Sequence, residues 1–534
     1  KRFTSNPLDE IIPIVDKYGS NSLIPITTID LFYMTVGRYS NLPAMAIKTT
    51  LKDNSKSEWK YWTFKQYWDD CILFGKALIS LQLQHHDVTN IIGFNSPEWF
   101  IAYNGSMMAA TIPAGLYSTN SPDSCQYVTS HSKAKVVILD GHDQLYKYKL
   151  IHSNLPDLKA IVVWGNFDQS TLESQGFNVP IFTWNEFLKL GLTISDESIQ
   201  SRIHYLKPGH CATLIYTSGT TGPPKGVMLS YDNIAWTCRV FANNIVEGGV
   251  TTGRIVSYLP LSHIAAQMID IQFPLYSGTC TYFAQPDALK GTLTVTLKEV
   301  QPTVFFAVPR VWEKIQEKLL EIAQKTTGIK KTISTWAKSR GTVHCNNIQY
   351  DSNNKGYLPW GYRLANYFIL RKIKEALGFN CCLGYYTAAA PISRDTLDYF
   401  ASLDIPILEL FGQTECTGPH SSSKLNAWKI GYCGRSLPGT KTKIDHETGE
   451  LRYTGRHIFM GYIYMPELTE QSFDSEGYLK SGDIATIDND IDPNIPDSSG
   501  FIKITGRIKD LIITSGGENI PPLLIEEMIV QNIP

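Results

Sequence analysis

One stretch constrains the fold of this chain more than any other: Leu214–Ser230, with the sequence LIYTSGTTGPPKGVMLS. Cys211–Tyr216, which overlaps its start, is largely apolar and short enough to be a buried strand. The polar run that follows is too flexible to continue a strand, so we predict a turn near Thr217. Small side chains let the backbone N–H groups of Ser218–Gly222 approach an anion closely. The stretch is therefore predicted to be a strand followed by a phosphate-binding loop.

The lysine that closes the stretch distinguishes this loop from a P-loop. Lys225 supplies a point charge for phosphate oxygens. A P-loop places Gly and Lys next to each other with Ser or Thr after them, whereas here two prolines separate Gly222 from Lys225, and Gly226 follows. We therefore disfavour a Walker-type nucleotide hydrolase. An ordinary Gly/Thr-rich surface turn is the other alternative. It would be the better interpretation for a shorter motif without a preceding strand and a closing lysine.

The whole stretch closely resembles the phosphate loop of the acyl-adenylate-forming superfamily, which includes acyl-CoA synthetases, luciferases and peptide-synthetase adenylation domains. The resemblance implies that ATP binds here, with Lys225 in a catalytic role. It implies nucleotide contacts from six loop residues: Thr217, Ser218, Gly219, Thr220, Thr221 and Gly222. It also implies that Thr220 shares a Mg²⁺ ion with a carboxylate elsewhere in the chain.

Short β-rich runs alternate with helical stretches in the first part of the chain. The alternation predicts parallel strands joined by crossover helices. One helix is expected to begin at NSPEW, with Asn95 or Ser96 as its cap. The predicted strands are Asn90–Phe94, Thr111–Ala114, Ala134–Leu139 and Ala160–Trp164.

We expect an α/β protein whose large N-terminal domain spans residues 1–506 and holds two parallel-sheet α/β subdomains. Short strands and turns at Gly449–Gly455 and Tyr462–Asp488 predict a β-barrel-like part at about residues 430–505. The resemblance implies a hinge and the beginning of a small α+β C-terminal domain in residues 507–534, with Lys509 at the hinge. No residue of this sequence matches the lysine with which that domain normally reaches the acyl phosphate.

Further segments resemble the superfamily's substrate-binding motifs. His263 in PLSH matches a histidine near the acyl carboxylate; without that match, a histidine among apolar residues is more often a packing residue. In ILELFGQTECTG, Phe411 would border the adenine, Thr414 the phosphate and Glu415 the Mg²⁺ ion. An aromatic ring offers a stacking face, and a carboxylate is the hard oxygen ligand that Mg²⁺ prefers. For Glu415 alone, a surface salt bridge is the alternative.

Two later residues complete the predicted nucleotide site. Asp483 in GYLKSGD resembles the aspartate that accepts hydrogen bonds from both ribose hydroxyls, and a carboxylate is a natural acceptor for a diol. Arg507 resembles a second contact to ribose or phosphate. Phe411 stands where many relatives have tyrosine, which keeps the stacking face but removes a hydroxyl.

Composition limits the partners. Lys and Arg total 48 against 50 Asp and Glu, so the formal net charge of −2 offers no general field to attract nucleic acid. Ten scattered cysteines indicate reduced core residues, and no apolar run approaches the ~18–20 residues of a membrane span, so we expect a cytoplasmic protein. Between about Glu321 and Leu377, basic residues alternate with aromatic ones such as Trp336 and Trp360. This pattern predicts a solvated helical face or, alternatively, a peripheral contact with intracellular membranes.

The closest resemblance is to the bubblegum-type long-chain fatty acyl-CoA synthetases, through SYLPLSHIAAQMID, FAVPRVWEKI and GRIKDLIITSGGENIPP. It implies ATP-dependent adenylation of a fatty acid and then thioester formation with CoA, with Mg²⁺ as cofactor. The carboxylate needs no general base because its pKa lies near ~4. Two alternatives stay open: an enzyme that loads an acyl group onto a carrier-protein thiol, and a non-catalytic ATP- or lipid-binding relative. The second is disfavoured because Lys225, Glu415, Asp483 and Arg507 are all present.

Overall fold

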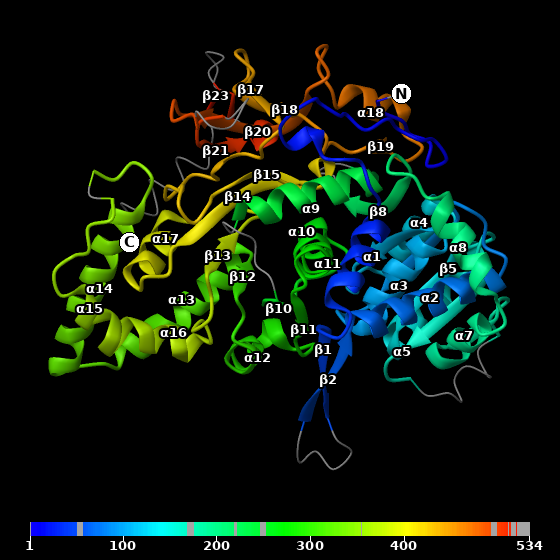
Figure 1. The fold of residues 1–534 in the computed structure, drawn as a ribbon, viewed down its shortest axis with the longest axis horizontal. Helices are drawn as coiled ribbons and strands as arrows, with labels where there is room; N and C mark the ends of the chain where they lie inside the picture. The colour runs from blue at the N-terminus through cyan, green and yellow to red at the C-terminus, as the bar shows by residue number, and fades with distance from the viewer. Residues whose placement is uncertain are drawn as a thin grey trace.

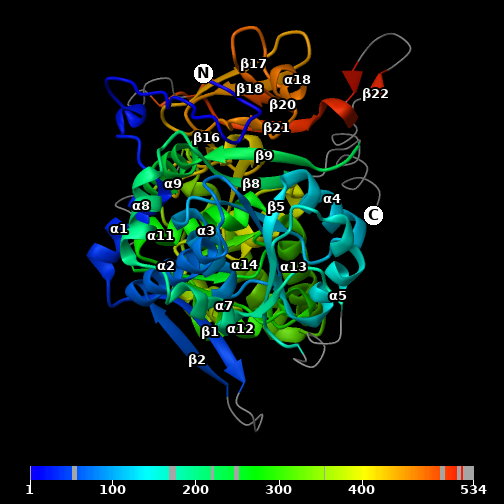
Figure 2. The same cartoon turned by 90° about the vertical axis from the view of Figure 1, so that its right-hand side faces the viewer.

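The fold comes from a computed structural model that describes residues 2–50, 57–167, 176–217, 222–245, 252–353, 355–492, 499–510, 512–513 and 519–520. Two α/β halves lie beside each other, and antiparallel strands from residues 441–507 form a layer across both of them (Figures 1 and 2). The chain therefore has the α/β architecture that its sequence predicts.

The first half is built on an eight-stranded sheet. In sheet order, the strands are β19 (Gly461–Tyr462), β9 (Lys225–Ser230), β8 (Cys211–Thr217), β4 (Ile112–Leu116), β3 (Val88–Ile92), β5 (Ala134–Asp140), β6 (Ala160–Trp164) and β7 (Ile181–Thr183). The strands from β8 to β7 are parallel, whereas β9 and β19 are each antiparallel to a neighbour. The predicted succession of parallel strands and helices is confirmed.

Alternate side chains of this sheet pack into two different cores, because successive residues of a strand point to opposite faces. Val136 and Ile138 of β5 lie in one core, and Val137 and Leu139 lie in the other. Among the helices that pack into the first core are α2 (Phe64–Ser80), α3 (Pro97–Met108), α7 (Trp184–Gly191) and α8 (Asp196–Tyr205). Those that pack into the second are α4 (Pro122–Ser132) and α5 (Gly141–Ile151).

The cap of α3 is Ser96 and not Asn95. Ser96 Oγ accepts a hydrogen bond from the Trp99 N–H at 3.3 Å, which satisfies a free donor of the first turn. Asn95 instead donates to Ser257 Oγ at 2.7 Å, across to the other half of the molecule. The two candidate caps therefore have different roles, one local and one between elements.

The second half contains two smaller sheets. One has the order β12 (Val304–Ala307), β13 (Gly384–Thr387), β14 (Ile407–Gln413), β15 (Gly418–Ser422) and β16 (Arg435–Ser436). Its first three strands are parallel and its last two antiparallel. The other has the order β10 (Arg254–Ser257), β11 (Cys280–Phe283), β1 (Pro43–Thr50) and β2 (Ser57–Thr63).

The remaining helices surround these sheets and the boundary between the halves (Figure 1). They are α1 (Thr28–Tyr39), α9 (Tyr231–Ile245), α10 (Ile264–Ala266), the π-helical turn η3 (Gln267–Gln272), α11 (Phe273–Ser277), α12 (Leu293–Val300), α13 (Pro309–Gln324), α14 (Gly328–Ile348), α15 (Tyr362–Ala365), the π-helical turn η5 (Asn366–Leu370), α16 (Arg371–Leu377) and α17 (Arg394–Ser402).

The region predicted to be barrel-like contains a four-stranded antiparallel sheet. Its order is β17 (Lys441–Ile444), β18 (Glu450–Thr454), β20 (Leu479–Ile487) and β21 (Ile502–Arg507), with helix α18 (Pro466–Gln471) between β18 and β20 in the chain. Two further strands of this region, β16 and β19, join the sheets of the α/β halves. Beyond Arg507, most of the predicted C-terminal part lies outside the described residues.

A buried ion pair ties the antiparallel layer to α9. Nε and Nη2 of Arg456 donate to the two carboxylate oxygens of Asp232, each at 2.6 Å, and the side chains are 1% and 2% exposed. Nη1 of Arg456 donates to the carbonyls of Asn21 and Leu23. This bidentate pair therefore joins the N-terminal segment, α9 and the residues after β18 at one point.

Candidate active site

A pocket of about 360 Å³ lies where strands of the two halves end. Thr217 is the last residue of β8 and Gln413 the last of β14. Strand ends are where α/β sheets bind their ligands. The lining residues are Tyr117, Thr217, Lys225, Phe241, His263, Ile264, Ala265, Met268, Ile269, Phe306, Ala388, Ala389, Leu410, Phe411, Gly412, Gln413, Thr414, Glu415, Gly418, Pro419 and Arg507. The predicted site residues among them are Thr217, Lys225, His263, Phe411, Thr414, Glu415 and Arg507.

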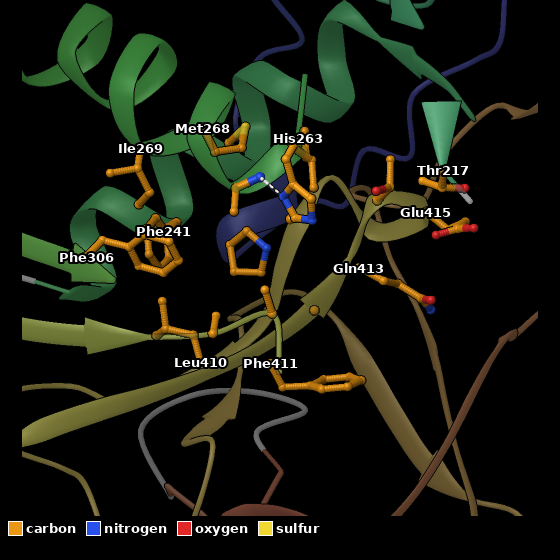
Figure 3. Close-up of a pocket in the computed structure, with 18 of the residues that line it drawn as sticks. Thr217, Phe241, His263, Met268, Ile269, Phe306, Leu410, Phe411, Gln413 and Glu415 are labelled. Atoms are coloured by element: carbon orange, nitrogen blue, oxygen red, sulfur yellow. Dashed lines mark hydrogen bonds between the residues drawn. The ribbon is translucent and has the colours of Figure 1, made fainter. Parts of the chain in front are cut away.

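The pocket has an apolar end and a polar end (Figure 3). Thr217 and Glu415 lie at the polar end, and His263 lies between the two ends. The apolar wall comes from four separate elements, namely α9, η3, β12 and β14, and no sequence motif indicated it. An apolar wall beside polar groups accommodates a molecule with a hydrocarbon part and a charged part. The wall consists of Phe241, Met268, Ile269, Phe306 and Leu410.

The predicted phosphate loop joins two antiparallel strands. Thr217 ends β8, Lys225 begins β9, and the two residues are cross-strand partners. Gly222 is exposed and has a φ of 99°, a conformation that favours glycine. The loop therefore starts and ends at the pocket. Its other predicted contacts lie outside the described residues: Ser218, Gly219, Thr220 and Thr221.

Glu415 contacts a tyrosine, Tyr462, that belongs to none of the sequence motifs. The Tyr462 hydroxyl donates to Glu415 Oε1 at 2.7 Å. The centre of the Tyr462 ring lies 5.3 Å from Lys225 Nζ, within the range of a cation–π contact. Burial, and then the neighbouring Glu415 carboxylate, raise the pKa of Tyr462, so the hydroxyl keeps its proton and can donate. Tyr462 therefore links the charged side chains of Glu415 and Lys225.

Strand pairing brings Tyr462 to this position. In the β19–β9 pair, Tyr462 is opposite Val227, two residues after Lys225 in the same strand. Glu415 lies in the 3-10 turn that joins β14 to β15. The sequence signal was only a Gly-Tyr pair after an apolar run, which does not reveal the neighbouring strand. Tyr462 could therefore be identified only from the folded structure.

His263 is arranged as a hydrogen-bond donor toward the pocket. It caps α10, and its Nδ1 accepts the Ala265 N–H at 3.1 Å. Burial lowers the pKa of His263, so the ring is neutral at pH 7. With Nδ1 as an acceptor, the neutral ring carries its proton on Nε2. This state suits contact with a carboxylate better than abstraction of a proton.

The helix after His263 widens where it forms the apolar wall. Pro274 lacks the N–H that would bond the carbonyl four residues earlier, at Asp270. That carbonyl accepts a hydrogen bond from the Thr281 hydroxyl at 2.8 Å. This interruption of the helical hydrogen bonds lies directly after the π-helical turn η3. Met268 and Ile269, both in η3, line the pocket.

The Asp270 side chain is a buried carboxyl behind this wall. Ser257 Oγ donates to Asp270 Oδ2 at 2.7 Å, and Asn95 Nδ2 donates to Ser257 Oγ, also at 2.7 Å. Burial raises the pKa of Asp270 to about 8. The carboxyl is therefore mainly uncharged at pH 7, and this hydrogen-bonded chain connects η3 to β10 and to the start of α3.

Asp483 and Arg507 are cross-strand partners in β20 and β21. Arg507 Nε lies 3.4 Å from Asp483 Oδ1, and Arg507 also lines the pocket. Burial raises the pKa of Asp483 to about 6, although the positive charge of Arg507 opposes the shift. Asp483 is not a lining residue, so it reaches the site's edge through Arg507. Lys509, the predicted hinge residue, follows in the 3-10 turn Ile508–Asp510.

Phe411 lies at the pocket edge, on β14. Its ring is edge-on to Tyr453, with ring centres 6.3 Å apart. Gln413, on the same strand, donates through Nε2 to the Tyr453 hydroxyl at 2.6 Å. Between them, a Cβ on Gly412 would lie 1.7 Å from the Gly418 carbonyl oxygen, so only glycine permits this approach of β14 to β15. The strand end therefore presents an aromatic ring, a glycine and an amide in succession.

The sequence matches known proteins over nearly its whole length. The profile of the family described as AMP-binding enzyme matches residues 35–463. A long-chain-fatty-acid–CoA ligase ACSBG2 from Xenopus laevis is 43% identical over 519 residues, which cover 96% of this chain and 67% of that protein. The ACSBG2 ligase from Homo sapiens is 40% identical over 538 residues, which cover 98% of this chain and 76% of that protein. The chain thus spans about two thirds to three quarters of the length of these relatives.

Solved structures agree on the fold. The anthranilate CoA ligase AuaEII, in complex with anthranoyl-AMP, aligns with a TM-score of 0.67 over 96% of this chain and 84% of its own. Its sequence identity of 18% supports the fold alone. The family follows from the profile match and from the identity with the ACSBG2 ligases. This chain belongs to the AMP-binding enzyme family and, within it, to the bubblegum-type long-chain-fatty-acid–CoA ligases.

Proposed function

We propose that this chain acts as an AMP-forming long-chain fatty acid–CoA ligase. The observation that carries the proposal is a pocket in which an apolar wall meets Lys225, Glu415 and Arg507. A fatty acid and ATP together need this combination, because one substrate is mostly hydrocarbon and the other is a polyanion. The relatives that match over nearly the whole chain are named long-chain-fatty-acid–CoA ligases, which supports the same activity here.

In the first half-reaction, the fatty carboxylate attacks the α-phosphorus of ATP, and pyrophosphate leaves. The carboxylate is already ionised at pH 7 and needs no general base. It needs alignment and charge neutralisation, since both reactants are anionic. We assign alignment of the carboxylate to the Nε2–H of His263 and neutralisation of phosphate charge to Lys225. The neutral state of His263 supports this role.

We assign the nucleotide to the polar end and the neighbouring antiparallel layer. The loop Thr217–Gly222 and Thr414 would bind phosphates through hydroxyl and backbone N–H donors. Phe411 would border the adenine, and Asp483 with Arg507 would hold the ribose. The position of Thr217, Thr414, Phe411 and Arg507 around one pocket supports the assignment.

The donor set at the polar end suits Mg²⁺. Proteins hold this ion through one or two carboxylates together with substrate phosphates. Glu415 would be the protein carboxylate and Thr220 the predicted hydroxyl ligand, while Tyr462 orients Glu415. When bound, the ion supplies positive charge against the phosphate oxygens.

In the second half-reaction, the CoA thiolate attacks the carbonyl carbon of acyl-AMP, a thioester forms and AMP leaves. We assign the hinge for the accompanying domain movement to Lys509. We place the protein in the cytoplasm, because its ten cysteines are all free, as in a reducing compartment.

Pyrophosphate release and thioester formation, measured side by side, test this proposal. Protein supplied with ATP, Mg²⁺ and fatty acids of graded length should release pyrophosphate and, with CoA, form acyl-CoA. Lys225→Ala should lose pyrophosphate release but keep its melting temperature, because the Lys225 side chain is only partly buried. Capture of the acyl group by a carrier-protein thiol but not by CoA would favour the carrier-loading alternative. Absence of both products with intact ATP binding would favour a non-catalytic relative.

A further inference from the structure

Helices α14–α16 and their connections carry a net positive charge, whereas the chain as a whole is slightly negative. Residues 328–377 contain nine Lys and Arg residues and two Asp and Glu residues, in a chain with a formal net charge of −2. The segment lies at one side of the second half, away from the eight-stranded sheet (Figure 1). The surplus of positive charge is therefore concentrated on one region of the surface.

Large apolar side chains are exposed in the same region. Trp360 is 82% exposed, the highest value among the large apolar residues that the structure describes. Leu364, Tyr367 and Phe368 are each more than half exposed. Exposed apolar residues are ordinary when they are scattered, but a contiguous group marks an interaction site. We call these four residues the Trp360–Phe368 face.

The helical repeat places three of these residues on one side, and Trp360 lies in the turn just before α15. Leu364, Tyr367, Phe368 and Arg371 follow the three- and four-residue spacing of a helix surface. The intervening Tyr362, Ala365 and Leu370 are buried against Ala337 of α14. The rings of Tyr367 and Phe368 are in contact, with centres 5.0 Å apart. The Trp360–Phe368 face therefore points outward from a packed support.

A buried polar cluster holds that support in place. Asp404 accepts hydrogen bonds from the Tyr362 hydroxyl at 2.9 Å, from Lys374 Nζ at 2.6 Å and from His344 Nδ1 at 2.7 Å. These three donors come from α15, α16 and α14, respectively. One aspartate thus ties the three helices together. The cluster therefore fixes the position of Tyr362, whose neighbours in the chain form the exposed face.

We propose that the Trp360–Phe368 face docks on an anionic lipid bilayer. Arg363, Arg371 and Lys372 are exposed beside it. Arg371 also forms an ion pair with Glu375, with 3.0 Å between Nε and Oε1. Tryptophan and tyrosine favour the membrane–water boundary, and flanking basic residues attract anionic headgroups. The surplus of nine basic over two acidic residues in this segment favours an anionic lipid surface as the partner. None of the helices in the described ranges is both long and apolar enough to cross a membrane.

Vesicle co-sedimentation tests the proposal, and it does not depend on the ligase activity. The protein should bind phosphatidylcholine vesicles that contain roughly one-quarter phosphatidylserine, and high salt should weaken binding. Trp360→Ala with Phe368→Ala should weaken binding at least about tenfold, and so should Arg363→Gln with Lys372→Gln, since each basic residue near the surface adds about a fivefold gain. ATP binding measures whether each variant is folded.

The matched control is Tyr18→Ala with Tyr33→Ala, which removes two aromatic side chains of similar exposure outside this segment. It should bind the vesicles like the unmodified chain. The proposal is overturned if the unmodified chain fails to sediment with anionic vesicles at low salt, or if the control loses as much binding as the Trp360→Ala, Phe368→Ala variant. Self-association that this variant abolishes, without vesicle binding, would identify a second copy of the chain as the partner and also overturn it.

Discussion

Replacing Tyr462 with phenylalanine separates the two contacts that this residue makes. The change removes the hydroxyl that donates to Glu415 Oε1 at 2.7 Å but leaves the ring near Lys225 Nζ. A hydrogen bond to a charged group contributes about 1.5–3 kcal/mol. Because Glu415 is only partly buried, water can replace part of this contact, so we expect the lower end, about 1.5 kcal/mol. That free energy corresponds to an affinity loss of about tenfold.

The expected loss concerns the Mg²⁺-dependent part of ATP binding. Calorimetric titration without fatty acid, once with Mg²⁺ and once with a chelator, measures that part without turnover. Tyr462→Phe should weaken Mg·ATP binding about tenfold and leave metal-free ATP binding unchanged, because only the orientation of Glu415 is lost. Glu415→Gln should show the same pattern more strongly.

Tyr148→Phe is the matched control for this experiment. The Tyr148 hydroxyl is also buried and hydrogen-bonded, to Thr129 at 2.8 Å, but Tyr148 does not line the pocket. Tyr148→Phe should lower the free energy of unfolding about as much as Tyr462→Phe does, but ATP binding should depend on Mg²⁺ as it does in the unmodified chain. If Tyr462→Phe weakens ATP binding equally with and without Mg²⁺, or leaves both unchanged, Tyr462 does not position Glu415.

Three further predictions concern buried charge. The Asp270 carboxyl keeps its proton up to about pH 8 in the folded chain and releases it near pH ~4 in the unfolded chain, so the free energy of unfolding falls as pH rises between these values. The melting temperature of Asp270→Asn should therefore fall less between pH 5 and pH 8 than that of the unmodified chain. The pKa of Asp483 is raised to about 6, so the chain should bind the ribose of adenosine more tightly as pH rises from 5 to 7. The Asp483→Asn variant should show no such pH dependence. Adenosine is the ligand because it has no phosphate that titrates, and the same pH dependence in the variant would exclude Asp483 as the acceptor. Asp232→Asn leaves the buried Arg456 charge unpaired and should lower the free energy of unfolding in urea by about 3–5 kcal/mol. The control Asp69→Asn, in an exposed ion pair with Lys65, should lower it by at most about 1 kcal/mol. Equal losses would contradict the structural role of the buried pair.

Much of the fold was predictable because its signals are local. Strand β6 has the predicted bounds Ala160–Trp164, since a short apolar run between turn residues is sufficient to indicate a buried strand. The choice between Asn95 and Ser96 as a cap was not predictable, because Asn95 bonds to Ser257, 162 residues later in the chain. The antiparallel direction of β9 and β19 was equally hidden from a pattern that reports on one strand at a time.

The stretch Leu214–Ser230 and the later motifs predicted that seven residues share a substrate site, and the fold places all seven around one pocket: Thr217, Lys225, His263, Phe411, Thr414, Glu415 and Arg507. Their roles toward substrates stay predictions. Only the tertiary structure decided what surrounds these seven residues. Tyr462 meets Glu415 across 47 residues of sequence. The apolar wall is assembled from four elements that share no sequence pattern. Such neighbours depend on strand order and register, and these follow from packing over the whole molecule and not from any local run of residues.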